Sequence, residues 1–326
     1  MSYKTLKQLS RREFLHFAMA AGSSVALGNA LANPLLPKRR NVLVLIELQG
    51  ANDGLNTLIP YADPAYYDLR PSLAISRDDT LQLTEKLGLH PSMPGFLRLW
   101  KNRQLAIVQG LGYPEPSRSH FRSIEIWETA SASNQVITQG WLSGYLNDTG
   151  QSEAPVLALA LGQDAGPLSG SPGNTLVMDD FRRFVETARQ MQLIENSTSN
   201  DSLRHILMVQ NSMQRAALSL AENSRKISTE RYQFPATPLG GQLQTIAELI
   251  INDSSIEIYK LGLGSFDTHA KQKRKHARLL EELSGAVDAF QKAMQAEGQW
   301  DNVLMMTYSE FGRRARENGS QGTDHG

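Results

Sequence analysis

The stretch NVLVLIELQGANDG (residues 41–54) begins with an apolar, β-branched run and turns polar and glycine-rich directly after residue 48. A short apolar run that stops near a glycine is typical of a strand buried on both faces. Four more runs of this kind follow, at residues 105–109, 156–161, 256–261 and 303–308. Because parallel sheets are covered on both faces, these runs predict a mostly parallel sheet.

Amphipathic helical patterns separate the apolar runs. The clearest lie at residues 91–102, 203–222 and 276–296, where apolar residues recur every three or four positions. Strands that alternate with such helices predict an α/β fold, a doubly wound and mostly parallel sheet sandwiched by helices. No internal repeat or domain linker interrupts residues 41–326, so we expect one domain after a short linker at residues 33–40.

The first 32 residues are interpreted as a targeting signal rather than as part of the fold. Arg11 and Arg12 precede a weakly apolar stretch, and residues 30–32 (ALA) form a small-x-small cleavage site. The arginine pair resembles the twin-arginine export signal. We therefore expect the twin-arginine export machinery as a partner, cleavage after Ala32, and a periplasmic or secreted mature protein.

A membrane anchor is the alternative interpretation of this segment. Glycine, serine and asparagine dilute its apolar character, and no later stretch approaches the ~20 apolar residues that a spanning helix needs. We therefore expect no stable membrane span in the mature form.

Charge and composition exclude several classes of protein. The 326 residues include 33 basic and 33 acidic ones, a balance that argues against a nucleic-acid-binding protein with a basic face. There is no cysteine, so disulfides, iron–sulfur clusters and thiol catalysis are excluded. A hydrophobic content of 40% suffices for a sizeable buried core.

Carboxylates and imidazoles gather where the predicted strands end. In a parallel sheet, ligands bind beyond the carboxyl ends of the strands. The acidic and histidine candidates at these positions are Asp53, Asp267, His269, Glu310, Asp324 and His325. Imidazole with carboxylate suits zinc, manganese or iron, whereas carboxylate with water suits magnesium or calcium. The sequence therefore predicts a divalent-metal site but leaves the identity of the metal open.

Ser119, Arg118 and Arg122 lie at the start of a helix that follows the second apolar run. A hydroxyl at a helix N-terminus faces the helix dipole, and arginine grips anionic oxygens in a bidentate manner. Simpler roles stay open at each position. Ser119 suits a helix cap, both arginines suit surface charge, and Asp53 suits a turn.

Longer motifs carry a family resemblance. In chain order they are LIELQGANDGLNTLIPYADPAYYDLRPSLAI, LHPSM, LAIVQGLGYPEPSRSHFRSIEIWETA, GWLSGYL, SFDTHA and TYSEFGRRARENGSQGTDHG. Over residues 41–326 the chain resembles domain-of-unknown-function family number 1501, which is placed in the alkaline phosphatase and sulfatase superfamily. The resemblance implies an alkaline phosphatase-like α/β sandwich with one or two divalent metal ions and a hydroxyl nucleophile at a helix N-terminus.

The resemblance also implies roles for single residues. Asp53 resembles the acidic ligand after the first strand, and Asp267 with His269 resembles the ligands of one metal. Asp324 and His325 resemble the aspartate–histidine pair of the other metal. Ser119 resembles the nucleophile, with Ser117 as the second candidate.

Two departures from the superfamily pattern concern the C-terminal part. Glu310 ends its strand where the superfamily usually has the aspartate–histidine pair, which makes this glutamate a further candidate ligand. The resemblance also implies more sheet beyond Gly326, which predicts a chain that is incomplete at its C-terminus.

The expected activity follows from the charge of such a site. Metal ions offset the charge of an anionic ester and activate a hydroxyl. We expect an exported metal-dependent hydrolase or transferase that acts on small phosphate or sulfate esters through a seryl intermediate. The alternative is a non-catalytic exported binding protein with an altered site. A redox protein is disfavoured, because cysteine and a Gly-x-Gly-x-x-Gly run after the first strand are both missing.

Overall fold

The computed structural model describes residues 40–149, 156–162, 164–171, 173–190, 200–223 and 229–326. The expected signal peptide at residues 1–32, and the linker at residues 33–40 except for its last residue, lie outside the described residues.

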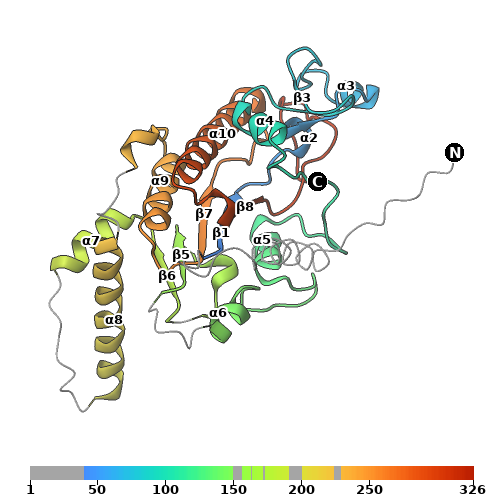
Figure 1. The fold of residues 1–326 in the computed structure, drawn as a ribbon. Coiled ribbons are helices and arrows are strands. Elements are labelled where there is room, and N and C mark those ends of the chain that lie inside the picture. The colour runs from blue at the N-terminus through green and yellow to red at the C-terminus, as the bar shows by residue number, and fades with distance from the viewer. Residues whose placement is uncertain (1–39, 150–155, 163, 172, 191–199, 224–228) are drawn as a thin grey trace, which may run out of the picture.

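A five-stranded sheet forms the centre of the fold (Figure 1). Its strands are β1 (Val42–Leu48), β5 (Ala158–Leu161), β6 (Thr175–Met178), β7 (Ile258–Leu263) and β8 (Val303–Tyr308). They lie in the order β6-β5-β7-β1-β8, and every neighbouring pair is parallel. The fold is therefore α/β with a mostly parallel sheet flanked by helices, as the sequence predicts.

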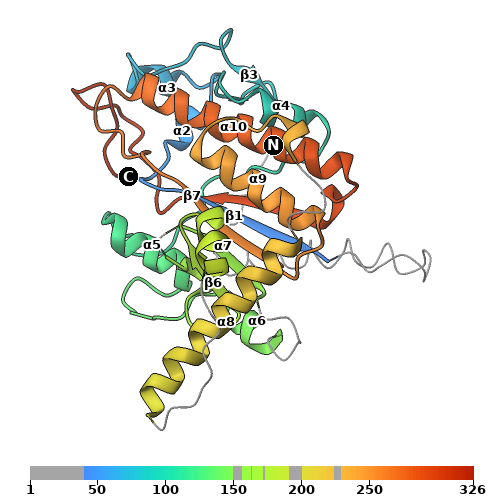
Figure 2. The same cartoon turned by 90° about the vertical axis from the view of Figure 1, so that its left-hand side faces the viewer.

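Helices cover both faces of this sheet, and a small second sheet lies beside it. The helices are α2 (Gly54–Thr57), α3 (Pro64–Leu69), α4 (Pro94–Lys101), α5 (His120–Thr129), α6 (Ser143–Thr149), α7 (Phe181–Gln190), α8 (Asp201–Asn223), α9 (Pro238–Ile251) and α10 (Gln272–Ala296), with short 3₁₀ turns η1 (Gly166–Leu168), η2 (Glu230–Tyr232) and η3 (Trp300–Asn302). The second sheet is antiparallel, with the order β2 (Leu58–Ile59), β4 (Gly88–Leu89) and β3 (Leu81–Gln82). Figure 2 shows α9 and α10 on one side of the main sheet and α5 and α6 on the other.

Strand β1 explains why the first apolar run is almost continuous. It pairs with β7 on one side and β8 on the other, so its backbone is paired along both edges. Val44 and Ile46 face the larger core, which includes residues of α9 and α10. Leu45 faces the second core, built with α6 and η1. Both faces of the strand are buried, and both therefore need apolar side chains.

One expected strand is wrong. Residues 105–109 form neither a strand nor a helix, although Leu105 and Ile107 pack partly buried against the larger core. No described strand pairs with this run, and only alternate residues of it are partly buried, so its apolar composition alone does not establish a strand. Strand β6 and helix α9 were not among the elements expected.

No helix in the described part of the chain is long and apolar enough to cross a membrane.

Candidate metal centre

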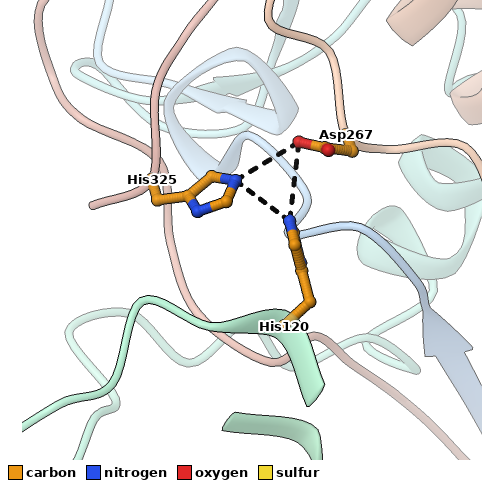
Figure 3. Close-up of side chains that lie close together, drawn as sticks. All are labelled: His120, Asp267 and His325. Carbon is orange, nitrogen blue, oxygen red and sulfur yellow. Dashed lines mark hydrogen bonds and ion pairs between the residues drawn. The ribbon is translucent and has the colours of Figure 1, made fainter. Parts of the chain in front are cut away.

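The end of β7, the start of α5 and the C-terminal tail meet at one point (Figure 3). His120 is the first residue of α5, Asp267 follows β7, and His325 lies in the tail. The tail is held beside the loop after β8 by an isolated antiparallel bridge between Arg313 and His325. One ligand atom from each of His120, Asp267 and His325 lies within 4.8 Å of the other two.

The close distances in this group join imidazole Nε2 atoms and one carboxylate oxygen. His120 Nε2 lies 3.0 Å from His325 Nε2, and these two nitrogens lie 3.6 Å and 3.4 Å from Asp267 Oδ1. His269 adds a fourth group, because its Nε2 lies 2.9 Å from Asp267 Oδ1 and 3.0 Å from His325 Nε2. We call His120, Asp267, His269 and His325 the histidine cluster.

The second nitrogen of each imidazole faces an oxygen. His120 Nδ1 lies 2.6 Å from Glu310 Oε1, and His269 Nδ1 lies 3.1 Å from Asp324 Oδ1. His325 Nδ1 donates to the carbonyl oxygen of Arg118 at 2.8 Å. Because carbonyl and ionised carboxylate oxygens only accept hydrogen bonds, each Nδ1 carries the proton in a neutral imidazole.

The three Nε2 atoms are then unprotonated, and their lone pairs point at one another. Two such nitrogens 3.0 Å apart cannot form a hydrogen bond, and their electron pairs repel. Arg313 Nη1 lies 3.5 Å from His269 Nε2, and no described donor reaches the other two Nε2 atoms, so a cation or an extra proton between the nitrogens would relieve this repulsion. An imidazole whose far nitrogen is held by a carboxylate or a carbonyl oxygen is also the usual form of a metal-binding histidine.

Glu310 is buried behind His120 and firmly held. Its Oε1 accepts from Gly50 N at 2.9 Å and its Oε2 from Ser309 Oγ at 3.0 Å. Its carbonyl oxygen accepts from Trp127 Nε1 at 2.7 Å, which ties the end of β8 to α5. Glu310 therefore orients His120 through Nδ1, on the side of the imidazole that faces away from the centre of the cluster.

Asp324 holds His269 in the same manner. Its Oδ1 also accepts from Asn318 Nδ2 at 2.9 Å. Hydrogen bonds from Asn318 and then His269 lower the pKa of Asp324, so the carboxylate stays ionised near neutral pH. Glu310 and Asp324, both expected as ligands, thus contact the outer nitrogens of histidines.

Arg313 joins the loops that carry the cluster. Its buried guanidinium donates to Ala51 O at 2.8 Å, Thr323 O at 2.9 Å and the Asp267 carboxylate. Burial raises the pKa of Asp267. The hydrogen bond and charge of Arg313, and then the charges of His269 and His120, together lower it by more, so the net shift of this pKa is downward. Arg313 was not predicted as a site residue, because an arginine among other arginines after a strand carries no distinguishing pattern.

Asp53 lies outside the histidine cluster. Arg70 Nη1 contacts its Oδ2 at 2.5 Å and Arg70 Nη2 its Oδ1 at 2.9 Å, and Gln272 Nε2 also donates to Oδ2. Both partners of this ion pair are buried, with side-chain exposures of 0% for Arg70 and 1% for Asp53. Both carboxylate oxygens of Asp53 thus accept hydrogen bonds within the fold, and the structure does not bring this residue together with the histidines.

The candidates around α5 are placed in different ways. Ser119 is the N-cap residue of α5, but its exposed hydroxyl makes no capping hydrogen bond. Ser117 Oγ accepts from Ser119 N at 3.2 Å. The Arg118 side chain is exposed beside the cluster, whereas Arg122 pairs with Glu125 at 2.8 Å and donates to Ser133 O at 3.0 Å.

His120 is the cluster member that was not predicted as a ligand. The sequence signal for it is its position at the start of the helix after the second apolar run, next to the candidate nucleophile Ser119.

Comparison with known proteins identifies the family. No match was found among curated proteins or among solved structures. Residues 40–326 match the family described as "Protein of unknown function (DUF1501)". This match covers most of the chain, including every residue of the histidine cluster, and the chain belongs to the DUF1501 family.

Proposed function

We propose that the histidine cluster binds a divalent metal ion and that the chain is an exported, metal-dependent hydrolase of the alkaline phosphatase and sulfatase superfamily. The observation that supports this most is the convergence of three Nε2 atoms whose Nδ1 partners are all oxygens. Such an arrangement is electrostatically unfavourable unless a positive charge lies between the nitrogens, and the Arg313 guanidinium reaches only His269 Nε2, at 3.5 Å.

The distances and donor types fit a transition-metal ion. Zinc lies about 2.0–2.1 Å from imidazole nitrogen, so two ligands at a tetrahedral angle are roughly 3.3 Å apart. The close distances in the cluster run from 2.9 Å between His269 Nε2 and Asp267 Oδ1 to 3.6 Å between His120 Nε2 and Asp267 Oδ1. Imidazole donors favour zinc, manganese or iron over magnesium and calcium, which prefer oxygen.

The protein's own groups have separate tasks in ester hydrolysis. Glu310 and Asp324 hold two imidazoles in the tautomer that presents Nε2 to the centre. Ser119 presents an uncommitted hydroxyl next to His120, at the positive end of α5, and is the proposed nucleophile. A divalent cation supplies positive charge against the phosphate or sulfate ester. Arg118 is the better placed of the two arginines to hold substrate oxygens, because Arg122 is paired with Glu125.

A non-catalytic binding protein is the second candidate. In the described part of the chain, the Ser119 hydroxyl makes no hydrogen bond to a carboxylate or an imidazole that would activate it. A metal-binding protein that holds an anionic ligand without turnover requires no such base.

Metal analysis combined with turnover separates the two candidates. The purified chain is loaded with Zn²⁺ or Mn²⁺, its metal content is measured, and hydrolysis of para-nitrophenyl phosphate and sulfate is followed. The enzyme proposal expects metal-dependent turnover that Ser119→Ala lowers by orders of magnitude, with Ser117→Ala as the matched control. Bound metal without turnover supports the binding protein. A chain that binds neither metal contradicts both.

Export is tested separately. We propose that residues 1–32 direct export through the twin-arginine pathway, on the basis of Arg11 and Arg12. Replacement of both arginines by lysine is expected to leave the precursor in the cytoplasm, as fractionation and immunoblotting would show. Normal export of that variant would contradict the proposal.

A further inference from the structure

A group of charged side chains lies between helix α5 and the main sheet, outside the histidine cluster. The side chain of Lys260, on β7, is 4% exposed, and its Nζ lies 3.2 Å from Glu47 Oε2 of β1 and 3.6 Å from Glu128 Oε1 of α5. Asp164, which precedes η1, also contacts Nζ. A Cβ atom added at Gly166 would lie 2.5 Å from Glu128 Oε1, so η1 packs directly against this ion pair. We call Lys260, Glu47, Glu128 and Asp164 the lysine network.

The lysine network holds more acidic than basic groups. One ammonium and three carboxylates leave a net charge of −2 when all four groups are ionised. Burial lowers the pKa of Lys260, but the three carboxylates together raise it by more, so the amine keeps its proton. Burial, and then the charges of these carboxylates, raise the pKa of the Tyr308 hydroxyl on β8 well above its usual value, so this group stays neutral. A proton on one of the carboxylates would reduce the excess of negative charge.

Glu128 is the carboxylate of the network that is least stabilised as an anion. Glu47 Oε2 lies 3.2 Å from both Lys260 Nζ and Gln49 Nε2, and the side chain of Asp164 is 61% exposed to water. Among the described residues, the Glu128 carboxylate pairs with Lys260 alone, at 3.6 Å, and it is 16% exposed. Burial raises the pKa of Glu128 to about 7 against the opposing charge of Lys260. Glu128 therefore takes up a proton near neutral pH.

Helix α5 connects Glu128 to the histidine cluster. His120 is the first residue of the helix, and at 1.5 Å per residue Glu128 lies about 12 Å further along its axis, in the last turn. The other charged side chains of α5, Arg122 and Glu125, pair with each other, and η1, which packs on α5, has no titratable group. The charge of Glu128 therefore acts on the contact between the last turn of α5 and the sheet, and a helix that shifts as a unit carries His120 with it.

We propose that Glu128 is a positioning residue for the candidate metal centre, which as a neutral acid holds α5 against the sheet and on ionisation loosens α5 and with it His120. This inference rests on the metal site proposed above. Ionisation of Glu128 raises the net charge of the network from −1 to −2, and an outward movement of the last turn of α5 returns the carboxylate to water. The network thus contributes a weakening of metal binding as the pH rises through neutrality.

Hydrogen exchange of the metal-free full chain tests the network by itself. After division by intrinsic exchange rates, α5 amides are expected to open about 30-fold more often at pH 8.5 than at pH 6, because ionisation with a pKa of about 7 favours the open form over this range. Glu128→Gln keeps the shape of the neutral acid and is expected to change by less than about threefold. Glu125→Gln is the matched control on the same helix, outside the network, and is expected to behave as the wild type.

Zinc affinity at two pH values links the network to the metal site. By competition with a chromophoric chelator, Glu128→Gln is expected to bind Zn²⁺ as tightly as the wild type at pH 6 and at least about threefold more tightly at pH 8.5. The ratio of the two affinities cancels the titration of the imidazoles, which both chains share.

Asp164→Asn separates a charge effect from a purely structural one. It removes one negative charge beside Lys260, so Glu128 is expected to ionise more readily. The midpoint of the pH dependence of α5 exchange should therefore move to lower pH. A midpoint that stays in place would contradict the proposal.

Two further results would overturn the proposal. They are an equal pH dependence of α5 exchange in the wild type and Glu128→Gln, and a ratio of Zn²⁺ affinities that does not change with pH. A wild-type chain that binds no Zn²⁺ at any pH contradicts the proposed function instead, and α5 exchange then still decides whether Glu128 controls the helix.

Discussion

Asp53 and Asp267 follow neighbouring strands at the same edge of the sheet, yet their surroundings are opposite. Asp53 is buried and contacted by Arg70 and Gln272, so its charge is neutralised within the fold. The Asp267 side chain is 46% exposed and faces three imidazoles as well as Arg313. The comparison teaches that a carboxylate at a strand end is free for a ligand only where the protein's own donors leave part of it uncovered.

The two arginines differ in the same way. Arg70 places both Nη atoms on Asp53 and donates further to Asn56 and to two backbone carbonyls. Arg313 donates mostly to carbonyl oxygens of three loops, contacts Asp267 through Nη2 alone, and places Nη1 3.5 Å from His269 Nε2. The first pair stabilises the fold, whereas the second orients a carboxylate that keeps an exposed side.

The largest expected effect is a loss of folding stability when the Asp53–Arg70 ion pair is broken. Asp53→Ala leaves a buried guanidinium without its counter-ion and is expected to lower the free energy of unfolding by about 3–5 kcal/mol in urea denaturation. Asp267→Asn is the matched control and is expected to cost only about 1 kcal/mol, because Arg313 retains its carbonyl partners. Equal losses for both variants would remove the distinction between the two carboxylates.

The next effect concerns the histidine cluster. His120→Ala is expected to weaken Zn²⁺ binding at least 100-fold in calorimetry, about 2.7 kcal/mol, because one imidazole donor is lost. Arg122→Ala, on the same helix but outside the cluster, is expected to leave affinity within threefold. Unchanged affinity in His120→Ala would exclude this histidine from the metal site.

Acid is expected to weaken the region around Asp53 through His276. Burial lowers the pKa of His276 from 6.5 to about 4, despite the opposing charge of Asp53, and its Nε2 lies 2.9 Å from Asn52 Oδ1. A folded-state pKa below the unfolded value gives stability that is present above pH 6.5 and lost as pH falls through about 4.

The expected loss between pH 7 and pH 4.5 is on the order of 2 kcal/mol, measured by urea denaturation at each pH. His276→Gln keeps a donor toward Asn52 but does not titrate, so its stability should depend less on pH over this window. The same pH dependence in that variant would assign the effect to other groups.

The smallest expected effect is on Zn²⁺ affinity when Glu310, which contacts the outer nitrogen of His120, is replaced. Glu310→Gln keeps an acceptor near His120 Nδ1 but removes the charge, and is expected to weaken Zn²⁺ binding about tenfold. Stability should change little, because Gly50 N retains an oxygen acceptor and Ser309 Oγ retains its hydrogen bond to Leu48 O. A 100-fold loss would indicate that Glu310 itself contacts the metal.

The fold was more predictable from the sequence than the site. Continuous apolar runs gave the positions of β1, β5, β7 and β8, since burial on both faces leaves a direct mark on composition. The run at 105–109 shows the limit of this signal, because pairing depends on a neighbour that composition does not reveal.

The residues expected to converge, because the ends of parallel strands share one edge, were Asp53, Asp267, His269, Asp324 and His325. The structure brings Asp267, His269 and His325 together and places Asp324 at the Nδ1 of His269, whereas Asp53 pairs with Arg70 instead. The sequence did not show which residue would face the centre of the cluster and which would support it. Glu310 was expected as a ligand, but its carboxylate contacts His120 Nδ1, and His120 Nε2 is the atom that faces the centre. Arg70 and Arg313 were missed for a related reason, because a buried arginine has no periodic pattern around it.

The cluster also joins parts of the chain that are far apart in sequence. His120 and His325 are separated by 205 positions, and residues 312–326 are also held to the fold by backbone bonds such as Lys271 N to Ser320 O and Gln272 N to Gln321 O. An ion shared by both histidines would act as a removable cross-link, restricting a loop whose closure entropy is worth roughly 5 kcal/mol. Chelation would then leave residues 312–326 held by hydrogen bonds and ion pairs alone, and the rate at which a protease cuts this segment is expected to rise as the metal concentration falls.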